Sequence, residues 1–488
     1  MASIKQETMS GAKWGMLQKI TMQPLQLVYG MVLARLITPE EMGIVGLTAI
    51  FFAIAAQLSN AGFGAALIRK LNRTEEDCST VFWFNMGMSF LVSMVLFLLA
   101  PWFTYFYNQP ELLWLTRASA LNMFLNSAGS VHWTLYQCRR DFKTPAIIQS
   151  ITAIAGMPVC LTLAWMGWGV WALMWQGIFT TILSLLIIWI ISPWKPRLVF
   201  SRKSFIDFFT FGSKLALSGM LHTLYTHART FIIGKFYSPA QLGFYDRGAK
   251  VAHLAPDTLC GILGQVIFPV LVRVQNDNVK LASAYRKYMR ITTLGIAWCT
   301  MILIALANPC VELCYGAAWL PCVPYLQIIA AGWLANHMST INLNLLMVKG
   351  RSDLFLHLEI IKKTVSIAML LYAATISVEA ICWASAIYCH LAVAFNAYFT
   401  GKIIGLTWWT QQKDYIPYLI LAALACTPSY FITLTSLPSI LQLILGGCSS
   451  LLFYLLPLHL CKEEAYAELY NTIKTTKWGN KILPFRTI

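Results

Sequence analysis

The sequence predicts an all-α, polytopic membrane protein with about fourteen transmembrane helices. Three observations predict this class. Of the 488 residues, 58% are hydrophobic and only 11% are charged, and the mean hydropathy is +0.62. Apolar stretches long enough to cross a bilayer also recur along the whole chain. A soluble protein of this length needs a much larger share of polar residues at its surface.

Each predicted span is a mainly apolar stretch of about 20 residues, the length that a helix needs to cross the hydrocarbon core. The spans are 13–36, 42–67, 79–104, 111–136, 146–166, 169–191, 209–236, 241–270, 291–307, 320–347, 354–376, 378–401, 415–435 and 437–460. Basic residues such as Arg69, Lys70 and Arg73 gather in every second gap, and the alternate gaps carry almost none. Because cytoplasmic loops carry the excess of Lys and Arg, both termini are expected in the cytoplasm.

The charge and cysteine content exclude several other classes. The net charge is +16, but the basic residues lie at predicted membrane edges, so no nucleic-acid partner is expected. The thirteen cysteines form no CxxC pair, so no metal site is expected. Cys310, Cys314 and Cys322 gather near one predicted outside loop, where a disulfide is an open alternative. No nucleotide-binding GxxxxGK[ST] motif occurs, which counts against direct ATP drive, and no cofactor is expected.

Short motifs recur at an offset of 200 residues. Arg35, Pro39 and Gly43 match Lys235, Pro239 and Gly243, and Gly11-Ala-Lys13 matches Gly212-Ser-Lys214 at an offset of 201. These matches predict two parallel six-helix lobes, with a substrate site between them near the midplane. The predicted organisation is an N-lobe (1–192), a cytoplasmic linker (193–208), a C-lobe (209–402), two appended helices (403–460) and a cytoplasmic polar tail (461–488).

The repeated segments and several others resemble the polysaccharide transporter family. The matching segments are 10–14, 34–43, 60–69, 242–245 and 266–275. The family belongs to the MATE/MOP flippase superfamily, so the resemblance implies a MOP-type fold. It also implies a non-enzymatic flippase that moves polyprenyl-pyrophosphate-linked oligosaccharides across the bacterial inner membrane, for O-antigen, capsule or exopolysaccharide assembly. The implied partners are this lipid-linked substrate, membrane lipids and other membrane proteins of polysaccharide assembly.

The span 241–270 carries the most informative polar residues. Asp246, Lys250, His253 and Asp257 fall at i, i+4, i+7 and i+11, which places them on one helical face beside Arg247. A charge in the bilayer core costs about 2.5–3.5 kcal/mol on insertion scales, so this face requires a polar environment. We expect it to line a central cavity, with Lys250 and Arg247 binding substrate and Asp257, Asp246 and His253 as candidate ion-coupling residues. A ladder of ion pairs packed against a neighbouring helix is the alternative.

Span 209–236 adds Arg229 and His222, which share a face. Arg229 is the strongest candidate for a phosphate contact, because a guanidinium is permanently charged and binds oxyanions in a bidentate manner. A salt bridge from Arg229 to Asp246 or Asp257 is the alternative, and a histidine such as His222 is more often a packed side chain than a ligand.

Three further residues extend the candidate set. Lys19 and Gln23 share a face of span 13–36, although Lys19 could equally snorkel to the interface. In span 354–376, a Glu359–Lys363 pair at i,i+4 would leave Lys362 to face the cavity or the inner headgroups.

The positive charge of the candidate lumen residues favours a flippase for an anionic lipid headgroup over a drug antiporter. The lumen candidates Lys19, Arg229, Arg247, Lys250 and Lys362 are basic, which suits an anionic pyrophosphate headgroup. The alternative is a MATE-like, ion-coupled multidrug or metabolite antiporter, whose lumen would be expected to carry acids. A membrane-bound polymerase or ligase is disfavoured because the predicted outside loops are short.

Overall fold

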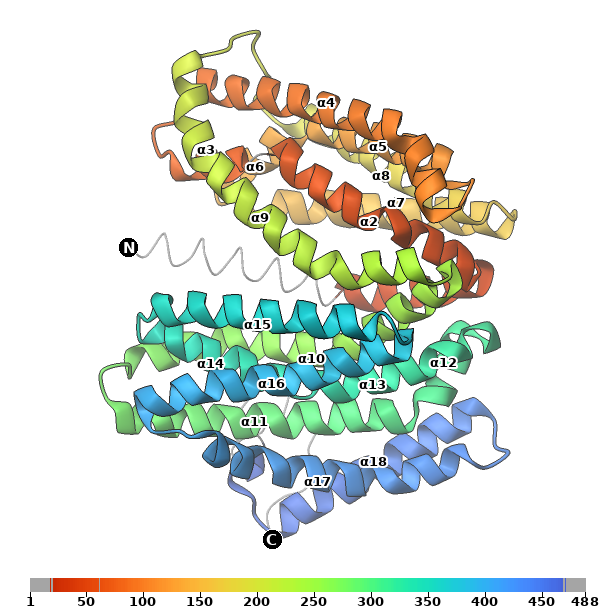
Figure 1. The fold of residues 1–488 in the computed structure, drawn as a ribbon, viewed down its shortest axis with the longest axis vertical. Helices are drawn as coiled ribbons and strands as arrows, with labels where there is room; N and C mark the ends of the chain where they lie inside the picture. Colours follow the sequence, from red (N-terminus) through yellow and green to blue (C-terminus); the bar gives the residue numbers. More distant parts are fainter. Residues whose placement is uncertain (1–17, 19–20, 61, 468–469, 471–488) are drawn as a thin grey trace. The chain divides into compact units, whose positions relative to one another are not determined.

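The computed structural model describes residues 18, 21–60, 62–467 and 470, without the side chains of residues 262–270, 352 and 356. Every element in these residues is a helix, which confirms the predicted all-α class (Figure 1). The chain forms two compact units, Met1–Gly243 and Phe244–Ile488. These units divide the chain after helix α9, whereas the sequence repeat places the lobe boundary before it. The lobe assignment therefore stays a prediction.

The first unit is a bundle in which α2 occupies a central position, because it packs against α4, α5 and α9. Residues 21–36 are helical. They are followed by α2 (Pro39–Asn60), α3 (Phe63–Arg69), α4 (Glu75–Tyr107), α5 (Leu112–Ser127), α6 (Ser130–Cys138), α7 (Lys143–Trp165), α8 (Val170–Ile191) and α9 (Arg202–Phe236). Helix α4 starts with a capping box: the hydroxyl of Thr74 accepts from the backbone N–H of Asp77, and the Asp77 carboxylate accepts from the N–H of Thr74.

Three predicted spans each consist of two helices rather than one. Span 42–67 is divided at Gly62, whose φ of +72° is a conformation that glycine adopts without steric cost. Span 111–136 is divided between α5 and α6, and span 320–347 between α13 and α14. Hydrophobic length does not reveal these breaks, because the apolar character of the sequence continues across them.

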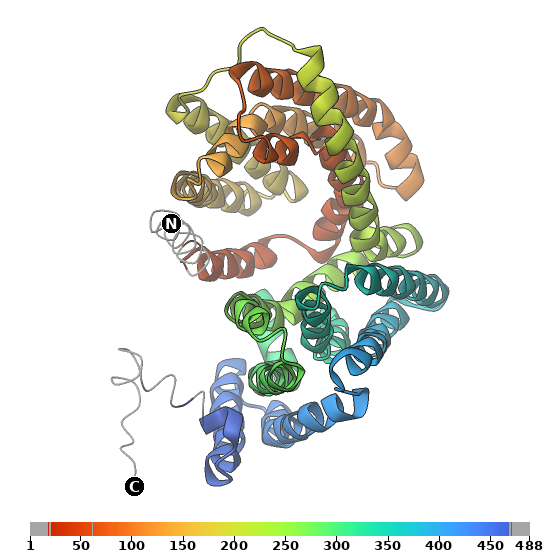
Figure 2. The same ribbon diagram turned by 90° about the vertical axis from the view of Figure 1, so that its left-hand side faces the viewer.

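The second unit continues from α10, which begins in the first unit. Its helices are α10 (Pro239–Arg273), α11 (Asn278–Ala305), α12 (Ala307–Tyr315), the 3₁₀-helix η1 (Ala317–Cys322), α13 (Val323–Trp333), α14 (Asn336–Val348), α15 (Ser352–Ala373), α16 (Val378–Ile404), α17 (Trp408–Thr433) and α18 (Ser439–Leu460). Figure 2 shows several of these helices end-on. Helix α17 packs against both α11 and α18, and this contact is filled by Leu294, Tyr418, Ala422 and Tyr454.

Two features of this unit correct the sequence expectation. Helix α11 begins at Asn278 rather than near 291, because the Asp277 carboxylate caps it by accepting from the N–H groups of Val279 and Lys280. Hydrogen bonds from the backbone and side chain of Lys280 lower the pKa of Asp277 below its usual range. In addition, the predicted outside loop around 308–319 contains α12 and η1.

Nine helices within the described residues are long and apolar enough to cross a membrane. This supports the polytopic class, but the predicted number of fourteen spans is not confirmed. Of the helices that carry candidate site residues, α9, α10 and α15 are not among these nine.

Candidate functional site

Helix α10 has one face that packs closely and one that is polar. On the packed face, a Cβ atom built on Gly248 would lie 3.0 Å from the backbone N of Leu326 and 3.2 Å from the carbonyl oxygen of Cys322. The backbones of α10 and α13 therefore approach closely, and Ala252 is fully buried beside this contact. The polar residues of α10 are less buried, because they lie away from this packed face.

The four residues predicted to share a face, here called the stripe, lie on that polar side of α10: Asp246, Lys250, His253 and Asp257. Lys250 and Asp257 are exposed, and Asp246 and His253 are half-buried. Since α10 is helical throughout this segment, the spacing of the four residues places them along one side over about three turns.

Trp333, the last residue of α13, contacts two residues of the stripe. Its Nε1–H donates a hydrogen bond to Oδ1 of Asp257 at 2.8 Å. Its indole also stacks on the imidazole of His253, with ring centroids 4.0 Å apart and an interplanar angle of 28°. A single aromatic residue thus orients the carboxylate and the imidazole that the sequence suggests for ion coupling, and sequence reasoning missed it.

Arg247 is held by aromatic rings rather than presented with the stripe. Its guanidinium carbon lies 4.8 Å from the ring centroid of Tyr315 and 5.0 Å from that of Trp319. Trp319 is only 1% exposed, so this cation–π contact fixes Arg247 against α12 and η1. The role of Arg247 as a substrate contact stays a prediction.

Lys362 is buried and close to Glu359. Its Nζ lies 2.6 Å from Oε1 of Glu359, whereas Nζ of Lys363 lies 3.9 Å from Oε2 of the same residue. The expected i,i+4 pair of Glu359 with Lys363 is therefore present, and Glu359 also forms a shorter pair with Lys362. Lys362 is only 4% exposed and is partnered rather than left to face a cavity.

The remaining candidates belong to the first unit. Arg229 is half-buried and His222 is exposed on α9, where the Thr226 hydroxyl donates to the His222 carbonyl at 2.9 Å. Gln23 is half-buried in the helix over residues 21–36. Lys19 lies outside the described residues.

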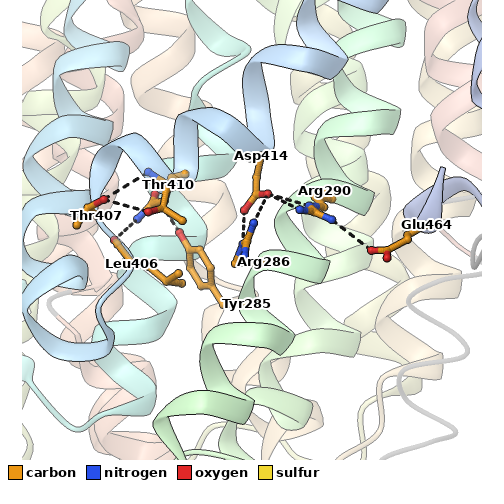
Figure 3. A network of polar contacts seen from close by, with 9 residues as sticks. Tyr285, Arg286, Arg290, Leu406, Thr407, Thr410, Asp414 and Glu464 are labelled. Atoms are coloured by element: carbon orange, nitrogen blue, oxygen red, sulfur yellow. Dashed lines mark hydrogen bonds and ion pairs between the residues drawn. The ribbon is translucent and has the colours of Figure 1, made fainter. Parts of the chain in front are cut away.

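A charged network that the sequence did not reveal joins α11 to α17 (Figure 3). The Asp414 carboxylate accepts from Nε and Nη2 of Arg286 at 2.6 and 2.9 Å and from Nε of Arg290 at 2.8 Å. Nη1 of Arg290 also reaches Oε2 of Glu464 at 3.4 Å. The side chain of Asp414 is 3% exposed, so two guanidinium groups compensate one buried carboxylate. The i,i+4 spacing of the two arginines is visible in the sequence, but their shared acceptor on α17 is not.

The cysteines form no disulfide, and the described His, Cys, Asp and Glu residues form no metal site. None of the thirteen cysteines forms a disulfide, so the alternative of a disulfide among Cys310, Cys314 and Cys322 is not supported. Within the part of the chain that the structure describes, no group of three His, Cys, Asp or Glu side chains could hold a metal ion.

The helical fold is similar to that of solved transporters of the MOP type. A solved structure described as the lipid II flippase MurJ, inward closed conformation, superposes with a TM-score of 0.71 at 14% identity and covers 93% of this chain and 100% of that one. An inward-facing multidrug resistance MATE transporter of the MOP superfamily gives a TM-score of 0.61 at 16% identity over 78% of this chain and 94% of that one. These similarities establish the fold.

Residues 32–324 match the family described as polysaccharide biosynthesis protein, and the chain belongs to this family. It is 23% identical to the teichuronic acid biosynthesis protein TuaB of Bacillus subtilis (strain 168), over 87% of this chain and 89% of the relative. It is 25% identical to the lipopolysaccharide biosynthesis protein WzxC of Escherichia coli (strain K12), over 74% of each chain. It is also 25% identical to the succinoglycan biosynthesis transport protein ExoT of Rhizobium meliloti (strain 1021), over 65% of this chain and 64% of the relative.

Proposed function

We propose that this protein translocates polyprenyl-pyrophosphate-linked oligosaccharides across the bacterial inner membrane by alternating access, for the assembly of a surface polysaccharide. The observation that carries the proposal is the polar side of α10 in a chain of the polysaccharide biosynthesis family. A helix within a membrane protein keeps basic and acidic residues on one side only where that side meets water, protein or a polar ligand. The relatives, named for three different polymers, support a shared lipid-linked substrate class rather than one particular sugar.

Lys250 is the strongest headgroup contact in the second unit. It is exposed on α10, whereas the two other basic candidates there are engaged, Arg247 by aromatic rings and Lys362 by Glu359. An ammonium group on a flexible stem can follow a moving pyrophosphate as a point charge. Within the first unit, Arg229 on α9 is the candidate for a bidentate phosphate contact. Both termini would lie in the cytoplasm, and the protein itself would carry out no bond chemistry.

Asp257 is the candidate for coupling transport to an ion gradient. Its carboxylate is exposed yet held by Trp333, with His253 stacked on the same indole. Binding of a coupling cation at this carboxylate would neutralise a negative charge on the polar side of α10, which favours binding of the anionic headgroup there.

The proposal is tested in a deletion strain of the native host by mass spectrometry of lipid-linked oligosaccharides. Complete repeat units are expected to accumulate while surface polymer is lost, and the intact gene should reverse both effects. Lys250→Met and Arg229→Ala should fail to restore export although the proteins reach the membrane. Lys280→Met is the matched control, since this lysine has an exposed side chain outside the stripe.

Each other outcome has a defined meaning. Unchanged lipid-linked pools in the deletion strain would overturn the flippase function and favour the antiporter. Full export by both variants would overturn the assignment of Lys250 and Arg229 while leaving the function in place.

A further inference from the structure

The first unit contains a cavity of about 470 Å³ between α2, α5 and the start of α6. Thirteen described residues line it, and all of them are uncharged. Eight of the thirteen carry a hydroxyl or a carboxamide, including Asn60, Asn122 and Asn126. The volume falls within the roughly 300–1,000 Å³ typical of small-molecule sites.

Part of this polar lining is satisfied by its own helices. The Ser59 hydroxyl donates to the Ala55 carbonyl at 2.9 Å, and Nδ2 of Asn60 donates to the Ala56 carbonyl at 3.1 Å. Such bonds use the donors and leave side-chain oxygens as acceptors. Oδ1 of Asn122 is buried without a hydrogen-bond partner among the described residues. An unsatisfied buried acceptor costs free energy, so the cavity has unused hydrogen-bonding capacity.

The uncharged, hydrogen-bonding lining of the cavity favours a neutral, hydroxyl-rich ligand. Neutral amides and hydroxyls match the hydroxyls of a sugar, and the Phe52 ring and the Met123 side chain in the wall offer apolar surface to the carbon–hydrogen face of a pyranose. An anion would find no compensating charge among the described lining residues. Arg117, also on α5, is held instead over the rings of Phe97 and Trp114 at 4.8 and 4.9 Å.

We propose that this cavity is a sugar subsite that receives an uncharged monosaccharide unit of the transported molecule, with Asn122 accepting from a sugar hydroxyl. The inference rests on the proposed function and adds a second contact region, separate in chemistry from the basic residues assigned to the pyrophosphate. Discrimination between glycans would then depend on the polar groups of α2 and α5 rather than on charge.

The test uses the purified full-length chain in nanodiscs and two probes. One probe is undecaprenyl pyrophosphate without sugar, and the other is the pool of lipid-linked oligosaccharides extracted from the native host. Asn122→Leu should weaken binding of the glycosylated probe about tenfold, the effect of losing a hydrogen bond and gaining an apolar wall. Binding of the sugar-free probe should not change. The matched control is Asn308→Leu, an exposed asparagine on α12, which should bind both probes as the wild type does.

Ser119→Ala serves as a second variant, because it removes one hydroxyl from the cavity wall and changes little volume. A selective few-fold loss for the glycosylated probe, with an unchanged melting temperature, supports the subsite. Equal weakening of both probes, or no weakening of either, overturns it while the proposed function stands. A wild-type chain that binds neither probe overturns the proposed function and this subsite together.

Discussion

The carbonyl oxygen of Pro239 occupies the place where a side chain on Gly43 would begin, and the carbonyl oxygen of Pro39 lies in the same way against Gly243. The two copies of the repeated motif therefore pack against each other. The glycine of each copy contacts the proline carbonyl of the other copy. Pro39 and Pro239 are also the first residues of α2 and α10, a position where the missing N–H of proline costs no hydrogen bond. This reciprocal contact accounts for the proline and the glycine of the repeated motif.

Gly43→Ala is expected to destabilise the folded protein by about 1–3 kcal/mol, because the new methyl group forces two backbones apart. The measurement is unfolding of the detergent-solubilised chain by denaturant. Gly87→Ala in α4 is the control, since a Cβ there meets nothing within 4 Å. Equal stability of the Gly43 variant and the control would contradict the close contact.

Asp414→Ala should loosen the attachment of α17 to α11. Removing this carboxylate leaves Arg286 and Arg290 facing each other without their shared acceptor, at an expected cost of about 1–3 kcal/mol for charged hydrogen bonds. The exposed pair of Asp353 with Arg351, whose side chains are 54% and 49% exposed, provides the comparison. Asp353→Ala should have little effect on unfolding, because solvent screens that pair. The reverse order of effects would argue against a structural role for the network.

Trp333→Phe separates the two contacts of this residue. The phenyl ring can still stack on His253, but it cannot donate to Asp257. If the hydrogen bond orients the ion-coupling carboxylate, the variant should lower transport driven by an imposed ion gradient while the amount of protein in the membrane stays constant. Asp257→Asn keeps the acceptor oxygen and removes the charge, so it should make transport insensitive to the gradient. Gradient-driven transport that neither substitution alters would remove Asp257 from the coupling step.

Arg247→Met and Lys250→Met should differ in how they fail. Loss of the Arg247 guanidinium also removes its contacts with Tyr315 and Trp319, so export and melting temperature should fall together. Lys250 is exposed, and its substitution should reduce export at constant melting temperature. If both variants change export and melting temperature in the same way, the cation–π contacts of Arg247 do not give it a structural role that Lys250 lacks.

The sequence predicted local features better than it predicted contacts between residues that are distant along the chain. Every predicted span overlaps a helix, since hydrophobic length is a local property, but the break at Gly62 depends on a single backbone angle. The stripe on α10 follows from helical spacing. Its partner Trp333 is 76 residues from Asp257 in the sequence, and Asp414 is 128 residues from Arg286. No periodicity within one helix identifies such pairs, because helix packing sets them.

The most direct test of the central claim is flipping by the purified chain in proteoliposomes that contain lipid-linked oligosaccharides from the native host. A membrane-impermeant glycosidase added outside cleaves only the outer-leaflet glycans, about half of the total in protein-free vesicles. With the wild-type chain the cleaved fraction should approach completion, and with Lys250→Met it should remain near one half. A wild-type chain that leaves the inner-leaflet half protected, although correctly folded and reconstituted, would contradict the flippase function.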